Sequence, residues 1–160
     1  MGLKELFDNS TVRRQDRLLD YCRAEELLLK AEYGFLSLGG ESGYGVPISF
    51  ALNGISLYFH SASQGEKLQR IKLNHQACFC VVGNSKLQPA QFAVDYESVM
   101  VFGRLTLIES DEEKRTALGF IINKYSPDFK EKGREYVERS FHKTVIFRLD
   151  IARITGKTRP

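Results

Sequence analysis

Two short stretches in the middle of the chain alternate apolar and polar residues, which is the pattern of half-buried β-strands. The first is Val46–Phe50 and the second is Ile55–Phe59. Asn53-Gly54 lies between them, and this pair favours the positive φ angles of a tight hairpin turn. The pattern therefore predicts a two-stranded ribbon with one buried face. The predicted buried residues are Val46, Ile48, Phe50, Ile55, Leu57 and Phe59.

The other face of this ribbon is polar, and the ribbon leads into a predicted anion site. After the small residues Ser61–Gly65, Leu68 and Ile71 lie three apart, as on one side of a helix. A helix start has unpaired N–H groups and a partial positive charge, and Lys67 adds a full charge, which together favour a phosphate. Alternatively, the small residues only form a turn and a helix cap. The outward-facing set is Pro47, Ser49, Ala51, Ser56, Tyr58 and His60.

The rest of the chain is predicted to alternate between strands and helices. Helices are predicted over residues 24–32 with Asp20 as N-cap and Gly34 as stop, from Gly65 to Asn74, from a Ser110–Glu113 capping box to Tyr125, and around 130–139. Strands are predicted over residues 35–38, 77–82, 96–108 with a bend at Gly103, and 144–151. Residues 39–43 read as a turn, residues 83–93 as a loop near a site or an interface, and residues 154–157 show no clear pattern.

These elements predict the fold class. About six strands joined mostly by hairpins, with three or four helices at their edges, favour a mainly β (α+β) fold built as a six-stranded antiparallel barrel, closed or nearly closed. The chain has 160 residues and no linker or repeat that would divide it. We therefore expect one domain over residues 1–160.

Composition narrows the class of protein. Hydrophobic residues make up 42% and charged residues 27%, which is typical of ordinary globular proteins and argues against disorder. No apolar run approaches the roughly 20 residues that cross a bilayer, and the first ten residues lack the apolar core of a secretory signal, so we expect a cytoplasmic protein with no membrane partner. A net charge of +3 without a dense basic stripe gives little support to nucleic-acid binding.

The three cysteines are expected to be free thiols, because their number is odd and no export signal is present. Cys78 and Cys80 would face the same side of a strand with His75 nearby, so a metal site is conceivable. A C-x-C pair without a second pair is a weak signature, and cysteine is often simply buried. We therefore predict no metal site.

Four stretches of the chain together resemble a known family. Tyr33–Ser37, Gly45–Phe50, Leu57–Ala62 and Gly65–Leu68 are similar to the FMN-binding split β-barrel family of pyridoxamine 5'-phosphate oxidase-related flavoproteins. Within that family they most resemble the branch of 5-nitroimidazole-resistance (Nim) reductases. The resemblance covers roughly residues 13–157 and therefore nearly the whole chain.

The resemblance implies FMN bound at a homodimer interface, with its phosphate held by one subunit and its ring between the two. The residues implied at the cofactor are Val46, Pro47, Ile48 and Ser49 beside the ring, Ser61 and Lys67 at the phosphate, Tyr96, Glu97 and Ser98 on the strand offered by the second subunit, and His60 near the flavin.

One position departs from the family's pattern. The family often has a further basic residue before the lysine of the phosphate loop, whereas this chain has Glu66, and Arg70 one turn later is a possible substitute. Other flat cofactors, haem or a deazaflavin, therefore remain alternatives to FMN. His60 is a candidate general acid because histidine titrates near neutral pH, but it could instead only hydrogen-bond a loop or the cofactor.

The favoured hypothesis is an FMN-dependent oxidoreductase that reduces a small electron-poor substrate such as a nitroaromatic. No G-x-G-x-x-G motif occurs, so a nicotinamide donor would bind only transiently over the flavin. The alternative is a non-catalytic flavin- or haem-binding protein, a carrier or a sensor of the same fold. Pyridoxamine phosphate oxidation is disfavoured, because the C-terminal segment lacks the basic residues expected for that substrate's phosphate.

Overall fold

The computed structural model describes residues 2–40 and 42–159, and in this part of the chain seven strands form one antiparallel sheet. Its strand order is β2-β1-β5-β6-β7-β4-β3. The strands are β1 (Gly34–Leu38), β2 (Tyr44–Ile48), β3 (Ala51–Asn53), β4 (Ser56–Ala62), β5 (Gln76–Gln88), β6 (Ala93–Leu107) and β7 (Thr144–Arg159). The mainly β class with antiparallel strands is confirmed.

The predicted count of six strands was wrong by one, and the ladder is not closed. A single strand was expected to run from Val46 to Ala51, but it is split into β2 and β3, which lie at opposite edges of the sheet. At the break, the Phe50 backbone bonds to a side chain instead of a strand. Its N–H donates to Tyr125 Oη at 2.9 Å, and its carbonyl oxygen lies 2.8 Å from the same hydroxyl.

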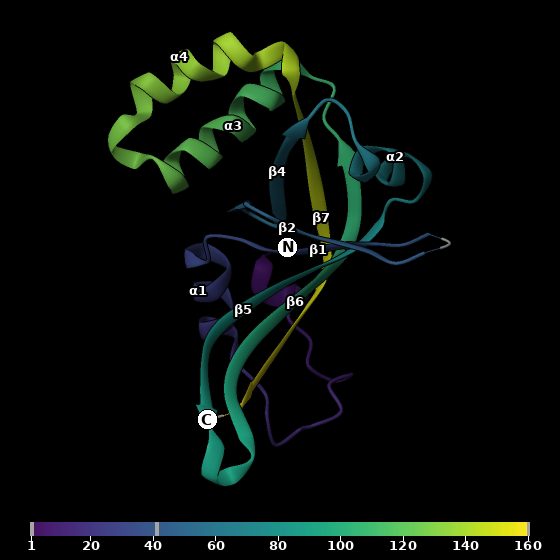
Figure 1. The fold of residues 1–160 in the computed structure, drawn as a ribbon, viewed down its shortest axis with the longest axis vertical. Helices are drawn as coiled ribbons and strands as arrows, with labels where there is room; N and C mark the ends of the chain where they lie inside the picture. The colour runs from purple at the N-terminus through teal and green to yellow at the C-terminus, as the bar shows by residue number, and fades with distance from the viewer. Residues whose placement is uncertain (1, 41, 160) are drawn as a thin grey trace.

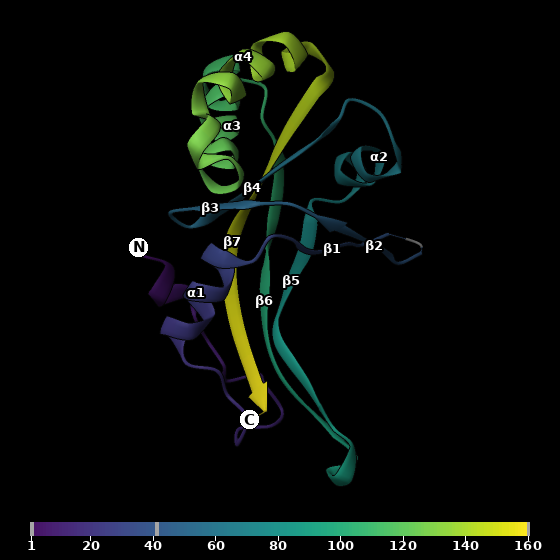
Figure 2. The ribbon, with the colours of Figure 1, turned by 60° about the vertical axis from the view of Figure 1, so that its left-hand side comes forward.

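The helices gather at two places around the sheet. They are α1 (Tyr21–Lys30), α2 (Glu66–Leu73), α3 (Asp111–Tyr125) and α4 (Lys130–Ser140), with short 3-10 turns at Leu3–Leu6, Pro89–Gln91, Pro127–Phe129 and Phe141–Lys143. Figure 1 shows α3 and α4 on one side of the upper end of the sheet and α2 on the other side. Figure 2 shows α1 beside the long lower part of the sheet, where β5, β6 and β7 extend away from α2, α3 and α4.

Four phenylalanine rings form the centre of the core. Phe79 packs edge-on against Phe50 and Phe59, with ring centroids 4.7 and 5.2 Å apart, and Phe59 stacks on Phe147 at 5.1 Å. All four side chains are fully buried, and burial of each contributes on the order of 2–3 kcal/mol. The predicted burial of Phe50, Leu57 and Phe59 is thus confirmed.

The hairpin turn lies one residue later than predicted. Asn53 pairs with Ser56, so Gly54 and Ile55 form the turn, and Gly54 has a φ angle of 58°. A glycine adopts this left-handed conformation at little cost, which fixes its place in the turn. Ile55, predicted to be buried, is instead 38% exposed.

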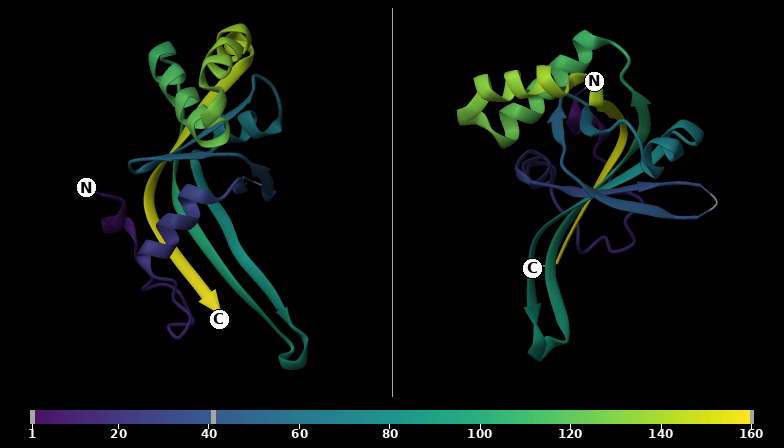
Figure 3. Two further views of the ribbon diagram at one scale, coloured as in Figure 1. Left: turned by 90° about the vertical axis from the view of Figure 1, so that its left-hand side faces the viewer. Right: turned by 45° about the horizontal axis from the view of Figure 1, so that its top comes forward.

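The predicted loop over residues 83–93 was also wrong. β5 continues to Gln88, and Pro89–Gln91 forms the tip of a long hairpin with β6. This hairpin and the end of β7, which reaches Arg159, form the arm seen from two further directions in Figure 3. The continuation of β5 was not predicted, because a hairpin exposed on both faces lacks a regular alternation of polar and apolar side chains.

The last strand is longer than predicted, because β7 continues past residue 151 through residues 154–157 to Arg159. Several other predicted boundaries agree with the structure more closely. Asp20 caps α1, but the helix ends at Lys30, before the predicted stop at Gly34, which lies in β1. Asn74 ends α2 as expected. The bend at Gly103 is confirmed, since the pairing of β6 with β7 shifts by one residue there. The predicted turn over 39–43 includes position 41, which lies outside the described residues.

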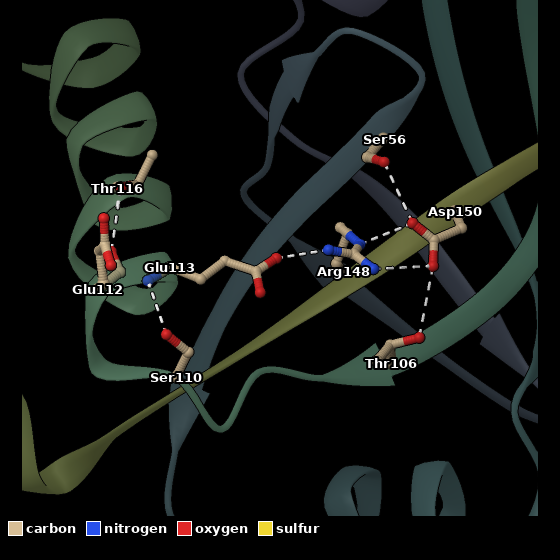
Figure 4. A network of polar contacts seen from close by, with 8 residues as sticks. All are labelled: Ser56, Thr106, Ser110, Glu112, Glu113, Thr116, Arg148 and Asp150. Carbon is tan, nitrogen blue, oxygen red and sulfur yellow. Dashed lines mark hydrogen bonds and ion pairs between the residues drawn. The ribbon is translucent and has the colours of Figure 1, made fainter.

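The start of α3 is tied to the sheet by a polar network (Figure 4). Ser110 Oγ accepts a hydrogen bond from the Glu113 N–H at 3.3 Å, as the predicted capping box requires. The Glu113 carboxylate does not complete the box but pairs with Arg148. Arg148 Nε donates to Asp150 at 2.6 Å, and Asp150 also accepts from the Ser56 hydroxyl at 3.2 Å. The network fixes α3 over β4 and β7.

None of the helices in the described part of the chain is both long enough and apolar enough to cross a bilayer.

Candidate functional site

The start of α2 has the features predicted for an anion site. The N-cap is Gly65, whose φ angle is 129°, and no side chain caps the first N–H groups of the helix. Lys67 is half-buried, and its Nζ lies 5.9 Å from the Phe147 ring. Among residues 2–40 and 42–159, Lys67 makes no salt bridge. Burial lowers the pKa of Lys67 from its ordinary value. A bound anion would compensate this desolvation.

Glu66 and Arg70 neutralise each other. Arg70 Nε lies 2.8 Å from the Glu66 carboxylate, and another guanidinium nitrogen donates to the Ser42 carbonyl at 2.6 Å. The guanidinium also lies 5.1 Å from the centre of the Tyr44 ring. Arg70 is therefore held beside the turn between β1 and β2, and the structure does not support its use as a second phosphate ligand. The Glu66 charge is compensated by the same guanidinium.

Ser61 and His60 are adjacent on β4 and face opposite sides of the sheet. Ser61 follows the buried Phe59 by two residues and so faces the side of the core, where Lys67 lies over Phe147. His60 follows Tyr58 by two residues and faces α3, as the predicted alternation requires. Ser61 and His60 therefore lie on opposite faces of β4, and the Lys67 charge still acts on the His60 ring.

The His60 ring lines a cavity of about 450 Å³ between the sheet and the α3–α4 pair. Its walls are mostly apolar, because Leu118, Ile121 and Ile122 of α3 meet Val137 of α4 there. Desolvation, and secondly the nearby Lys67 charge, lower the pKa of His60 below 6.5. At neutral pH the imidazole is therefore uncharged and offers one donor and one acceptor.

Residues 46–49 lie on and just after an edge strand. β2 pairs with β1 alone, so the backbone groups on its other edge have no partner strand in the described sheet. Val46 and Ile48 pack against the core, whereas Pro47 is exposed. Ser49 follows the end of β2 and lines a second cavity, of about 540 Å³. An exposed strand edge beside a cavity can bind a flat ligand whose rim carries polar atoms.

Lys124, near the end of α3, was not predicted to take part in any site. It lines the same cavity as Ser49, and its Nζ is buried without a hydrogen-bond partner within the described residues. Burial lowers the pKa of Lys124 to about 8. The sequence did contain a signal, because Lys124 lies three and seven residues after the apolar Ile121 and the buried Ala117, on one face of the helix.

Tyr96, Glu97 and Ser98 are far from these groups within one chain. They lie near the start of β6, where Tyr96 pairs with Arg159, whereas Leu107 at the end of β6 pairs with Phe147. The nine residue-to-residue steps from Ser98 to Leu107 span about 30 Å along an extended strand. The Glu97 carboxylate makes a two-point ion pair with Arg23 of α1, at 2.8 and 2.7 Å, which lowers the Glu97 pKa. One chain therefore assembles only part of the predicted site.

Cys78 and Cys80 are free, partly buried thiols on β5. Burial raises the pKa of the Cys78 thiol to about 11 and also raises that of Cys80, so both are protonated at neutral pH. His75 Nδ1 lies 3.1 Å from the Leu105 carbonyl oxygen. In the part of the chain that the structure covers, no three His, Cys, Asp or Glu side chains gather as metal ligands.

Comparison with known proteins places the chain in a family. The family model described as pyridoxamine 5'-phosphate oxidase matches residues 22–158. A solved structure of a candidate 5-nitroimidazole antibiotic resistance protein from Bacteroides thetaiotaomicron is 26% identical, with a TM-score of 0.71, over 89% of this chain and 86% of that one. We find no curated protein that matches the chain.

Two further structures share the fold at lower identity. The flavocytochrome Anf3 from Azotobacter vinelandii is 21% identical with a TM-score of 0.76, over 88% of this chain and 68% of that one. The FAD and haem binding protein from Mycobacterium smegmatis is 18% identical with a TM-score of 0.78, over 90% and 73%. Because the family model covers most of the chain, this protein belongs to the pyridoxamine 5'-phosphate oxidase family.

Proposed function

We propose that this protein binds FMN and acts as an FMN-dependent oxidoreductase that reduces a small electron-poor substrate such as a nitroaromatic. The observation that carries the proposal is the uncapped start of α2 beside Lys67, a half-buried lysine with no salt bridge in the described structure. Structural neighbours that bind flavins, and the Bacteroides protein linked to nitroimidazole resistance, support the same assignment.

The residues present fit an FMN molecule at three points. Lys67, the first N–H groups of α2 and the Ser61 hydroxyl supply donors for a phosphate dianion. The unpaired edge of β2 supplies backbone donors and acceptors for the polar rim of the ring, with Pro47 as an apolar contact. FMN, when bound, supplies the electron-transfer chemistry, while the protein sets orientation and excludes water.

The cavity beside His60 fits the substrate. Its volume of about 450 Å³ lies within the usual range for small-molecule sites, and its apolar walls suit a planar aromatic molecule. His60 is one of the polar side chains that line this cavity, and it can hydrogen-bond a nitro group or deliver a proton to it. A nicotinamide donor would bind only during reduction of the cofactor.

A second copy of the chain would complete the site. Tyr96, Glu97 and Ser98 lie about 30 Å along β6 from the level of Phe147, too far to meet a ligand held at Lys67 in the same chain. The outer face of the sheet is apolar in its middle, where Phe35 pairs with Cys80 and is 46% exposed. A homodimer formed through this face would cover it and bring the second chain's strand to the cofactor.

Anaerobic reduction of the FMN-loaded protein tests the activity. We expect the flavin absorbance to bleach on addition of NADH or NADPH and to return when a 5-nitroimidazole is added. A flavin that stays oxidised with both donors, although dithionite reduces it, would remove the proposed reductase activity while leaving FMN binding intact.

The second candidate is a non-catalytic flavin- or haem-binding protein, a carrier or a sensor. His60 favours it, because an exposed and neutral imidazole at a cavity could ligate haem iron. The flavocytochrome and the FAD and haem binding protein among the structural neighbours fit this alternative. A haemin titration separates the two functions, because this candidate predicts a Soret band that shifts in His60→Ala.

A further inference from the structure

Lys124 Nζ is the only side-chain nitrogen or oxygen atom in residues 2–40 and 42–159 that is buried and lacks a hydrogen-bond partner. It lies 3.7 Å from the Phe50 ring centre and 5.4 Å from that of Tyr125, contacts that compensate only part of the lost hydration. A buried ammonium without an anion is costly, and such groups are normally paired. An acceptor or anion from outside the chain would compensate the cost of burying this ammonium.

The groups around the Lys124 cavity do not supply that partner. Glu32 lines the same cavity, yet no salt bridge joins it to Lys124 in the described structure. The Tyr125 hydroxyl lies 2.6 Å from the Glu32 carbonyl oxygen and is engaged with the Phe50 backbone. Lys30, which also lines the cavity, pairs with Glu26. Apart from the Lys30–Glu26 pair, the cavity wall therefore carries one ammonium, that of Lys124, and one carboxylate, that of Glu32, without a salt bridge between them.

The position of Lys124 relates it to the proposed FMN site. The start of β2 lies beside α2, because Tyr44 contacts Arg70, and its far end leads to Ser49 and the Lys124 cavity. The five residue-to-residue steps from Tyr44 to Ser49 span about 17 Å. A ligand extended along this edge, with its phosphate at α2, would have its other end near Lys124.

We propose that Lys124 contacts the pyrimidine end of the FMN ring and stabilises the negative charge that reduction places there. Hydride transfer from a nicotinamide adds two electrons and one proton to the neutral ring, so one negative charge remains, and it resides mainly at the pyrimidine end. A fixed ammonium at that point stabilises the reduced form more than the oxidised form. The inference rests on the proposed binding of FMN.

The midpoint potential of bound FMN tests the role of Lys124. We expect Lys124→Met to bind reduced FMN at least tenfold more weakly relative to oxidised FMN, which for a two-electron couple is a potential lower by about 30 mV. Lys124→Arg keeps the charge and should stay close to the wild-type potential. Lys130→Met, at an exposed lysine of α4, is the matched control and should leave the potential unchanged.

The outcomes separate this inference from the proposed function. If the wild type binds FMN and Lys124→Met has the same potential, Lys124 does not contact the ring and the inference is wrong while FMN binding stands. If the wild type binds no FMN, the proposed function fails and this inference fails with it. Lys124→Gln serves as a second neutral variant, and circular dichroism of each apoprotein shows whether it is folded.

Discussion

Lys124 Nζ and the Phe50 ring centre lie 3.7 Å apart, and the next residue, Tyr125, bonds to the Phe50 backbone. Lys124 and Tyr125, two successive residues of α3, therefore both contact Phe50, where the predicted single strand is divided into β2 and β3. Tyr125 replaces the missing strand partners, whereas Lys124 places a charge against an apolar ring. The hydrogen bonds of Tyr125 stabilise the fold, whereas the buried charge of Lys124 is unfavourable unless a ligand compensates it.

We predict that Lys124→Met stabilises the apoprotein at pH 7. The pKa of this amine falls from 10.5 in the unfolded chain to about 8 in the fold. Below pH 8 both states are protonated and the full burial cost applies, about 1–2 kcal/mol after allowance for solvent screening. Between pH 8 and 10.5 the unfolded chain binds more protons, so the stability of the wild type rises with pH.

Urea denaturation of both proteins from pH 7 to pH 10.5 measures this effect. The stability difference between Lys124→Met and wild type should shrink as the pH rises. Taking the difference in unfolding free energy between the two proteins cancels the contributions of other groups that titrate in the same range, such as the tyrosines. A wild type that is more stable than the variant at pH 7 would contradict this prediction.

Tyr125→Phe should destabilise the protein by about 1–3 kcal/mol, because it leaves the buried Phe50 backbone without its partner. Tyr136→Phe is the matched control, since Tyr136 is 67% exposed and should change stability very little. Chemical denaturation of both variants gives the comparison. Equal stabilities for the two would show that the hydroxyl of Tyr125 does not support the strand break.

Gly103 and Gly119 should respond in opposite directions to alanine. A Cβ at Gly103 would lie 2.1 Å from the Asp150 carbonyl oxygen, so the bulge between β6 and β7 must move, with a loss of about 3 kcal/mol or more. A Cβ at Gly119, inside α3, meets nothing within 4 Å and should stabilise the helix by about 0.5–1 kcal/mol. Thermal unfolding of both variants reports the sign, and a Gly103→Ala protein as stable as wild type would disprove the tight bulge.

His60→Ala should lower kcat/KM for a nitroaromatic at least about tenfold while the bound FMN content stays the same. The pKa of His60 lies below 6.5, so the acid form is present only at lower pH. The ratio of wild-type to variant activity should therefore fall as the pH rises through that pKa. Rates measured from about pH 5 to pH 8 check this, and a ratio of one throughout would favour the non-catalytic alternative.

Local patterns predicted most of the fold. Asp20 and Ser110 cap α1 and α3 as their residue types indicate, and Gly103 marks the bulge between β6 and β7. Such features depend on neighbours in sequence and so can be read from it. The strand break at Phe50 could not be predicted, because its cause, the Tyr125 hydroxyl, lies 75 residues away.

The candidate site could be predicted only in part, because some of its residues follow local patterns whereas others are brought together only by tertiary packing. Lys67 follows a loop of small residues and precedes apolar helix positions, and this local pattern indicated its place at the start of α2. Lys124 carries no local motif beyond a charge on an apolar helix face, and only tertiary packing brings it beside Ser49. Glu97 is a similar case, since its ion pair with Arg23 of α1 depends on a tertiary contact that no local pattern reveals.

Titration of the apoprotein with FMN and with riboflavin, which lacks the phosphate, tests the central claim most directly. We predict that the wild type binds FMN at least about tenfold more tightly than riboflavin, since charge-assisted hydrogen bonds contribute about 1.5–3 kcal/mol. Lys67→Met should lose most of that preference, while Lys72→Met, at an exposed lysine of the same helix, should keep it. Equal affinity of the wild type for both ligands, or a Lys67→Met protein with an unchanged preference, would contradict the account.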